Sequence, residues 1–307
     1  MTIIFQILII AATVLGLWGG AVWVVESSSR IAKKLGLSEL VIGLTVVAIA
    51  TSAPEFAVTV SAALANKISI SVGNVVGSNI FNLGVILGLV AIFGKIAISR
   101  TMLLRDGMLL VGTGILLIIF FYDLELSFWE GIFLAITLVI YIFVLIRQKE
   151  SIDEEVPAGE FKWFDIIRLI VGVAVIIASA NYLVDSASEL AIHFGVSEWM
   201  IGITIVAAGT SVPELATSIV ALSKGRHGIS IGNLIGSDLF NMLGVLGVAS
   251  IIRPLAISQS EFFSIILLAV NLLILLVIMR TGWKISKLEG AILIVIALIR
   301  WWAVSFI

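Results

Sequence analysis

Long apolar stretches alternate with short polar connections along almost the whole chain. Each stretch is about as long as the ~20 residues that a helix needs to cross the hydrocarbon core of a bilayer. The pattern therefore predicts ten membrane-spanning helices. They are expected at residues 2–25, 38–65, 70–93, 106–122, 128–146, 164–185, 197–223, 229–252, 260–279 and 287–306. The longest connection, Arg147–Lys162, divides five spans from five and is too short to fold as a domain.

The composition agrees with a membrane protein. The 307 residues are 61% hydrophobic and only 12% charged, whereas a soluble domain carries roughly 25% charged residues. The net charge of −2 comes without a basic patch, which excludes nucleic acid as an expected partner. The chain has no cysteine for a thiolate metal site, and both histidines lie in polar connections. We expect the lipid bilayer as surroundings, no cofactor, and a monomer.

Basic residues gather in alternate connections. Of the 18 Lys and Arg residues, fourteen follow the odd-numbered spans, three lie on the opposite side, and Arg168 lies just inside the sixth span. Basic loops tend to stay in the cytoplasm during insertion. This bias predicts that both termini face outward from the cell membrane and that the linker at 147–163 is cytoplasmic.

One segment of the sequence occurs twice. GLSELVIGLTVVAIATSAPEFA (36–57) matches GVSEWMIGITIVAAGTSVPELA (195–216), and ISVGNVVGSNIFN (70–82) matches ISIGNLIGSDLFN (229–241). The offset is constant, because 195 − 36 and 241 − 82 both equal 159. A shared lipid-facing pattern would reproduce apolarity, but not the same Thr, Ser, Pro, Glu and Asn at fixed spacing.

The repeat also predicts the architecture. Five spans per copy is an odd number, so the second copy enters the membrane upside down, as in the inverted repeats of secondary transporters. The predicted fold is an all-α integral membrane protein with ten transmembrane helices in two inverted five-helix repeats. Residues 1–146 form the first repeat and residues 164–307 the second. Glu55 and Glu214 then lie at the same depth in oppositely oriented copies.

Each copy places proline directly before glutamate inside a span. Pro54 and Pro213 have no N–H to donate and open the preceding helical turn, which predicts that helices 2 and 7 are broken. Freed carbonyls are tolerated at membrane depth only against protein or a wet cavity. Glu55 and Glu214 each cost about 3 kcal/mol or more at the centre of a span. A bound cation offsets both costs, although a buried structural hydrogen bond remains the alternative for each glutamate.

The neighbouring side chains are hard oxygen donors. Carboxylates, hydroxyls, amides and carbonyls suit Ca²⁺ or Na⁺, and no soft ligand for Zn²⁺ or Cu⁺ is present. Ser78 and Asn82 are four residues apart and share one helix face, as do Ser237 and Asn241. Hydroxyls in spans usually bond their own backbone, so their role as ligands depends on the repeated Pro-Glu pair beside them.

At these residues the sequence resembles the sodium/calcium exchangers of the calcium:cation antiporter superfamily, prokaryotic type. The family signatures G-[ST]-S-x-P-E and G-N-x-x-G-S-N-x-x-N occur here as ATSAPE, GTSVPE, GNVVGSNIFN and GNLIGSDLFN. The resemblance implies that ions are bound by Ala48, Thr51, Ser52, Glu55, Ser78, Asn82, Ala207, Thr210, Ser211, Glu214, Ser237 and Asn241. The two alanines and two threonines would act largely through their backbone carbonyls.

Three positions depart from the family pattern. Ala50 replaces the usual glycine, which changes only local backbone freedom. Asn241 stands where potassium-dependent relatives carry aspartate, which argues against potassium co-transport. Asp238 stands where asparagine is usual, about 100° round the helix from Ser237. We expect Asp238 to point away from the site; the alternative is a third titratable carboxylate.

The resulting hypothesis is a secondary antiporter that exchanges Na⁺ for Ca²⁺ by alternating access and extrudes Ca²⁺. A Ca²⁺/H⁺ antiporter of the same superfamily is the alternative, because two buried glutamates can carry protons. A channel or an intramembrane enzyme is less favoured. Two fixed carboxylates bind Ca²⁺ too tightly for fast conduction, and no nucleophile accompanies the acids. We therefore expect a transporter and not an enzyme.

Overall fold

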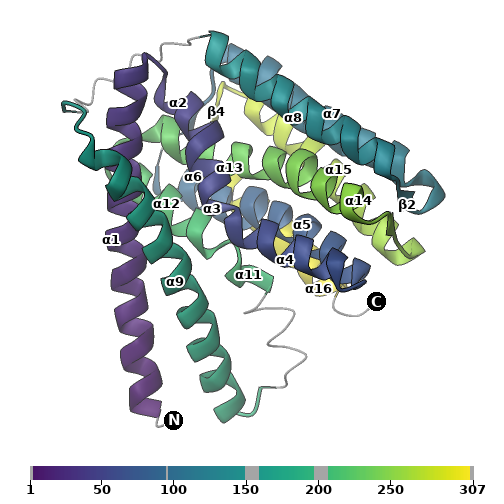
Figure 1. Cartoon of the computed structure of the whole chain (residues 1–307), viewed down its shortest axis with the longest axis horizontal. Coiled ribbons are helices and arrows are strands. Elements are labelled where there is room, and N and C mark those ends of the chain that lie inside the picture. The colour runs from purple at the N-terminus through teal and green to yellow at the C-terminus, as the bar shows by residue number, and fades with distance from the viewer. Residues whose placement is uncertain (1–2, 95, 149–158, 197–206, 305–307) are drawn as a thin grey trace. The chain divides into compact units, whose positions relative to one another are not determined.

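The computed structural model describes residues 3–94, 96–148, 159–196 and 207–304, with the side chains of 207 and 301–304 excepted. The described chain is almost entirely helical, as the apolar pattern predicts (Figure 1). Its helices group into two compact units. The first unit comprises Met1–Ser52 and Lys149–Asn233, and the second comprises Ala53–Gln148 and Leu234–Ile307. Each unit therefore takes segments from both halves of the sequence. The predicted linker, 147–163, and the start of the seventh span, 197–206, lie largely or wholly outside the described residues.

Seven described helices are long and apolar enough to cross a membrane, and an eighth is interrupted. The seven are Ile3–Leu35, Ile68–Phe93, Met102–Asp123, Phe128–Gln148, Phe164–His193, His227–Ile252 and Gln259–Arg280. The interrupted helix is Glu39–Thr51 with Ala53–Leu64. Of the ten expected spans, the tenth is helical but carries Lys287, Glu289 and Arg300. Only the second part of the seventh, Val212–Ser223, is described as a long helix. The chain is thus a multi-pass, helical membrane protein.

Helices α1 (Ile3–Leu35) and α9 (Phe164–His193) pack side by side and antiparallel in the first unit (Figure 1). Small residues let them approach closely: a Cβ added at Gly20 would lie 2.8 Å from the Gly172 carbonyl oxygen, and one at Gly172 would lie 2.9 Å from that of Gly20. Both helices extend well beyond the apolar stretches that predicted them, at 2–25 and 164–185. Their polar ends are stabilised by pairing between the two helices.

The rest of the first unit consists of short helices around the repeated motifs. They are α2 (Glu39–Ile42), the π-helical η1 (Gly43–Val47), α3 (Ala48–Thr51), α11 (Ala207–Gly209), α12 (Val212–Ser223) and the first part of α13 (His227–Leu239). Gly43 and Gly232 permit close contact between η1 and α13. A Cβ at Gly232 would lie 2.7 Å from the Leu40 carbonyl oxygen.

The second unit is a helical bundle. Its helices are α4 (Ala53–Leu64), α5 (Ile68–Ile80), η2 (Phe81–Ile86), α6 (Leu87–Phe93), η3 (Met102–Gly107), α7 (Met108–Phe120), η4 (Phe121–Asp123), α8 (Phe128–Gln148), η6 (Phe240–Val245), α14 (Leu246–Ile252), α15 (Gln259–Arg280) and α16 (Lys287–Val304), with the end of α13. Helix α4 packs on α5, and α6, α7 and α8 pack on α16, α15 and α14 respectively. The π-helical segments η2 and η6 lie at corresponding positions, 159 residues apart.

Two pairs of very short strands join connections of the second unit. Strand β1 (Ile96–Ala97) pairs antiparallel with β4 (Lys284–Ile285), and β2 (Glu125–Leu126) pairs antiparallel with β3 (Leu255–Ala256). The offset of 159 relates β1 to β3 and β2 to β4, so one sheet repeats the other in the same register. Two-residue strands are too short to appear in the hydrophobic pattern.

The backbone extends the repeat beyond the matching sequence. Residues with positive φ occur in pairs 159 apart, at Asn66 with Gly225 and at Leu124 with Trp283. The Leu124–Trp283 pair has no sequence identity to reveal it. The helix starts correspond as well, because the Ser99 hydroxyl caps Met102 as the Ser258 hydroxyl caps Glu261. The two copies therefore share local structure through spans whose sequences have diverged.

Candidate ion-binding site

The helix that carries the first Pro-Glu pair breaks at Ser52. Ser52 leaves the helical conformation, with ψ 10°, and α4 then starts at Ala53. Pro54 lies in the first turn of α4, where its missing N–H costs nothing. Glu55 lies in the same turn, at the positive end of the helix dipole, which favours a negative charge. Proline and glutamate are thus neighbours because the break makes a new helix N-terminus inside the interrupted span.

The second copy repeats this arrangement. Ser211 has ψ 4° and precedes α12, with proline at the start of that helix and Glu214 in its first turn. Glu214 is fully buried, as is Glu55. The predicted breaks in helices 2 and 7 are therefore present in the described residues, directly after Thr51 and Thr210 of the two motifs. The sequence pattern correctly predicted where the two helices break and that proline is the cause.

In the first unit, a hydroxyl of one motif contacts the carboxylate of the other. The Ser52 hydroxyl donates to Glu214 Oε1 at 2.8 Å. The Thr51 hydroxyl donates to Asn233 Oδ1 at 2.9 Å. Thr51, Ser52, Ser211 and Glu214 are all buried, and Thr210 is half-buried at the break. The first unit thus brings the Thr-Ser pair of the first copy against Glu214 and Asn233 of the second.

An asparagine anchors the backbone of each glutamate. Asn233 Nδ2 donates to the Glu214 carbonyl at 3.3 Å and to the Ser218 hydroxyl at 3.0 Å. In the second unit, Asn74 Nδ2 donates to the Glu55 carbonyl at 3.2 Å and to Thr59 at 3.0 Å. These bonds hold each carboxylate-bearing turn against the following helix.

Each anchor is supported by a pair of hydroxyl–carbonyl contacts between the same two helices. The Ser71 hydroxyl donates to the Thr59 carbonyl at 3.0 Å, and the Ser230 hydroxyl donates to the Ser218 carbonyl at 2.9 Å. The sequence interpretation did not assign roles to these residues or to the two anchoring asparagines. For Ser71, Asn74, Ser230 and Asn233, their identity at corresponding places in the repeated GN segment was the signal that could have found them.

Asn82 and Asn241 lie in the π-helical turns η2 and η6 of the second unit. Such turns are frequent at functional sites. Asn82 Nδ2 donates to Asp238 Oδ1 at 3.1 Å, and Asn241 Nδ2 donates to Asn79 Oδ1 at 3.1 Å. The Oδ1 atoms of Asn82 and Asn241 are buried and have no hydrogen-bond partner among the described residues. Asp238 thus contacts a candidate ligand and does not point into solvent or lipid.

The remaining predicted ligands are placed as follows. Ser78 and Ser237 are buried one turn before Asn82 and Asn241. Ala207 lies at the start of α11. The Ala48 carbonyl accepts the Ser52 N–H at 3.0 Å and so remains in the helical ladder, although a carbonyl oxygen has a second lone pair for a further contact. Pro54 has no N–H to donate to the Ala50 carbonyl. The carbonyl that loses its helical hydrogen bond is therefore that of Ala50, two residues after Ala48.

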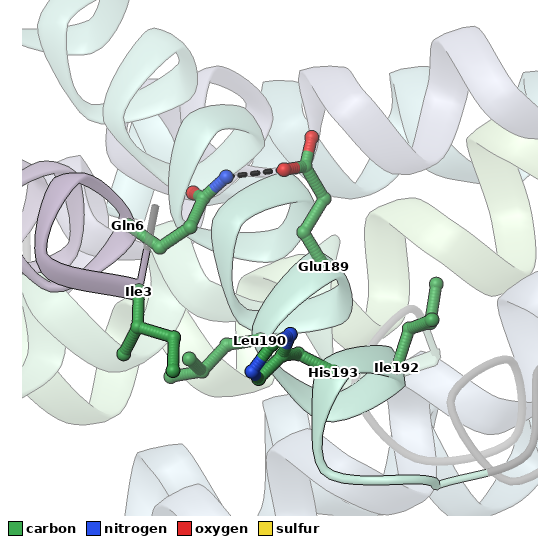
Figure 2. Close-up of a pocket in the computed structure, with 6 residues that line it drawn as sticks. All are labelled: Ile3, Gln6, Glu189, Leu190, Ile192 and His193. Atoms are coloured by element: carbon green, nitrogen blue, oxygen red, sulfur yellow. Dashed lines mark hydrogen bonds between the residues drawn. The ribbon is translucent and has the colours of Figure 1, made fainter. Parts of the chain in front are cut away.

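The first unit also has a pocket whose lining includes none of the predicted ligands. Ile3, Gln6, Glu189, Leu190, Ile192 and His193 line it, between the start of α1 and the end of α9. Figure 2 shows the Gln6 amide reaching across to the Glu189 carboxylate, to which it donates a hydrogen bond. At the other end of these helices, Arg30 pairs with Asp165 at 2.8 Å. This hydrogen bond and this ion pair occupy corresponding positions in the two repeats, because 165 − 6 and 189 − 30 both equal 159.

The fold and these donors define a class of protein: a multi-pass membrane transporter with two copies of an oxygen-rich motif on broken helices. The family model described as sodium/calcium exchanger protein matches residues 5–147 and 164–305. The chain therefore belongs to the sodium/calcium exchanger family, in the calcium:cation antiporter superfamily, and the resemblance in the motifs is confirmed. This family comprises exchangers, so the expectation of a transporter rather than an enzyme is confirmed too.

Individual relatives match over nearly the whole chain. The sodium/calcium exchanger MaX1 of Methanosarcina acetivorans is 32% identical, with 89% of this chain and 91% of that protein covered. The inner membrane protein YrbG of Escherichia coli is 32% identical, with 90% and 91% covered. Solved structures of the sodium-calcium exchanger NCX_Mj match with a TM-score of 0.85 and 29% identity, covering 97% of this chain and 98% of that one.

Proposed function

We propose that this antiporter exchanges Na⁺ for Ca²⁺ by alternating access and uses the inward Na⁺ gradient to extrude Ca²⁺. The observation that carries the proposal is the duplicated motif: in each copy a buried glutamate at a helix break is anchored by asparagine to the next helix. A duplicated acid with hydroxyl and amide oxygens suits a hard cation. MaX1 and NCX_Mj, which are named sodium/calcium exchangers, match over most of their length.

We further propose that Glu55 and Glu214 serve the same transported ion. The other ligands in the proposal are Ala48, Thr51, Ser52, Ser78, Asn82, Ala207, Thr210, Ser211, Ser237 and Asn241. The halves 1–146 and 164–307 would be inverted five-helix repeats, with both termini outside the cell and the linker at 147–163 cytoplasmic. The bias of Lys and Arg toward alternate connections supports this orientation. A monomer suffices for the mechanism.

The buried amides favour Na⁺ over H⁺ as the coupling ion. Protonation neutralises a glutamate, but an amide oxygen does not titrate in the physiological range. The Oδ1 atoms of Asn82 and Asn241, to which no described residue donates, would therefore stay unsatisfied in a proton-loaded carrier. A Na⁺ ion satisfies carboxylate and amide oxygens together.

Reconstituted vesicles test the coupling directly. Vesicles loaded with Na⁺ and diluted into Na⁺-free medium at uniform pH should take up radioactive Ca²⁺. Vesicles loaded with acid, without Na⁺, should stay empty. Uptake with the reverse pattern would replace the sodium assignment with Ca²⁺/H⁺ exchange. Ca²⁺ entry that needs no counter-ion inside would indicate a channel.

A further inference from the structure

Four side chains in the second unit form one buried hydrogen-bonded group. Asn79 and Asn82 come from the first repeat, and Asp238 and Asn241 come from the second. All four are fully buried. Besides the two bonds between side chains at 3.1 Å, Asn79 Nδ2 donates to the backbone carbonyl of Asp238 at 3.3 Å. Each candidate ligand is thus bonded to a residue of the other repeat.

The chemistry of the acceptors decides which way each amide faces. The Oδ1 atom and the backbone carbonyl of Asp238 both accept hydrogen bonds, from Asn82 Nδ2 and Asn79 Nδ2 respectively. The NH₂ groups of Asn82 and Asn79 must therefore face Asp238. Since the Asn79 NH₂ is used in this way, its Oδ1 faces Asn241, and only the Asn241 NH₂ can complete that bond. The orientation of both ligand amides thus follows from the acceptors around Asp238.

This orientation has a consequence for ion binding. When the NH₂ of Asn82 or Asn241 points to its partner, the Oδ1 atom points the other way. Both Oδ1 atoms are buried, and no described residue donates to them. A buried acceptor without a donor is costly, and a cation removes that cost. A flipped amide would instead direct two N–H donors at the cation.

We propose that Asp238 and Asn79 are positioning residues, which hold the Asn82 and Asn241 amides so that their oxygens face the transported ion. The inference rests on the proposed function of these two asparagines as ligands. Asp238 would act on the ion through Asn82, and Asn79 through Asn241. Each repeat therefore orients the ligand that the other repeat supplies.

The two positioning residues correspond in the repeat, because 238 − 79 equals 159, but they are not chemically equivalent. Asp238 offers a charge-assisted acceptor, which is the stronger kind. Asn79 is itself oriented by the Asp238 backbone carbonyl. Replacement of the Asp238 side chain should therefore disturb mainly Asn82, whereas replacement of Asn79 should disturb mainly Asn241.

Substitutions at position 238 separate acceptor geometry from other roles. Asp238→Ala removes the acceptor and should raise the Ca²⁺ concentration for half-maximal uptake about tenfold or more, in line with the loss of a hydrogen bond to a charged group. Asp238→Asn keeps an acceptor oxygen and should stay within about threefold of the wild type. Unchanged apparent affinity in Asp238→Ala would overturn the proposal. Equal damage in both variants would overturn it as well, because the charge and not the acceptor would then matter.

Full-length protein in detergent supplies the second readout. The rise in melting temperature with added Ca²⁺ or Na⁺ reports ion binding without transport. If the wild type shows no rise with either ion, the proposed function fails. If the wild type and Asp238→Ala show equal rises, only the positioning role fails. Where Asp238→Ala does not fold, Asn79→Ala replaces it, with the same expected loss of ion-induced stabilisation and the same contrary outcome.

A matched control separates ion binding from general stability. Ser250 is buried in the same unit, and its hydroxyl donates to the Gly247 carbonyl at 3.0 Å. Ser250→Ala should lower the melting temperature without changing the half-maximal Ca²⁺ concentration. A shift of that concentration in the control as large as in Asp238→Ala would show that any buried polar loss disturbs the site, against a specific positioning role.

Discussion

At the scale of single residues, the two buried glutamates should be indispensable. Glu55→Gln and Glu214→Gln each remove one negative charge from a buried position and keep the volume, so the protein should fold and reach the membrane. Because hydrogen bonds and ion contacts with charged groups contribute about 1.5–3 kcal/mol, Ca²⁺ transport should fall about tenfold to a hundredfold in each. Radioactive Ca²⁺ uptake with quantified protein measures this. Glu125→Gln, at an exposed strand residue, should match the wild type, and near-normal uptake in either buried variant would reject a shared role.

Among single residues, those with an unusual chemistry for a span could be predicted from the sequence, and those defined by a distant partner could not. A buried carboxylate beside proline is improbable in a span, so Glu55 and Glu214 stood out from the sequence. Asn74 and Asn233 did not stand out, because an asparagine in a span is compatible with many ordinary structural roles. Their roles depend on bonds to carbonyls of another helix, which are visible only in space. For Asp238, the expectation of a side chain turned away from the site missed its bond to Asn82. Helical geometry places a residue on a face, but it does not select its partner.

At the scale of elements, the repeated glycines should differ in tolerance. Gly73 and Gly232 correspond at the offset of 159, yet their surroundings are not alike. A Cβ at Gly232 would meet the Leu40 carbonyl oxygen at 2.7 Å, whereas at Gly73 no described atom lies within 4 Å. Gly232→Ala should therefore destabilise the protein by about 1–3 kcal/mol through overpacking. Gly73→Ala should be neutral or gain about 1 kcal/mol from helix propensity. Thermal unfolding in detergent compares them, and equal loss in both would contradict this account of the packing.

The predicted elements were correct in kind but not always in extent. Apolar length identified the spans, since bilayer thickness sets the length of a helix that crosses it. It placed the ends of the first and sixth spans about ten and eight residues too early, because α1 ends at Leu35 and α9 at His193. These ends are polar, and their partners are distant in sequence: Lys224 pairs with Glu26 at 2.6 Å. The two-residue strands escaped prediction for the related reason that pairing, not periodicity, defines them.

At the scale of the whole molecule, the structural repeat extends beyond the segments whose sequences match. The strand register, the positive-φ residues and the helix caps recur at the same offset in regions with little sequence identity. Each compact unit takes segments from both halves of the sequence. The two copies therefore do not fold as separate domains side by side, and sequence comparison alone could not reveal this exchange of segments.

The charge moved in one transport cycle follows from the charges in the ion site. Two ionised glutamates carry a charge of −2, which one Ca²⁺ or two Na⁺ neutralise. The family resemblance implies one Na⁺ more, so that each cycle moves one net positive charge in the direction of Na⁺. In Na⁺-loaded vesicles this charge leaves, and an inside-positive potential should therefore increase Ca²⁺ uptake. One charge crossing 100 mV corresponds to about 2.3 kcal/mol, so the accumulation ratio should change about tenfold per ~60 mV.

Valinomycin with set K⁺ gradients clamps the potential while the Na⁺ gradient stays fixed. A ratio that does not respond to the clamp would indicate electroneutral exchange of two Na⁺ for one Ca²⁺, and a response of the opposite sign would contradict the proposed direction of net charge.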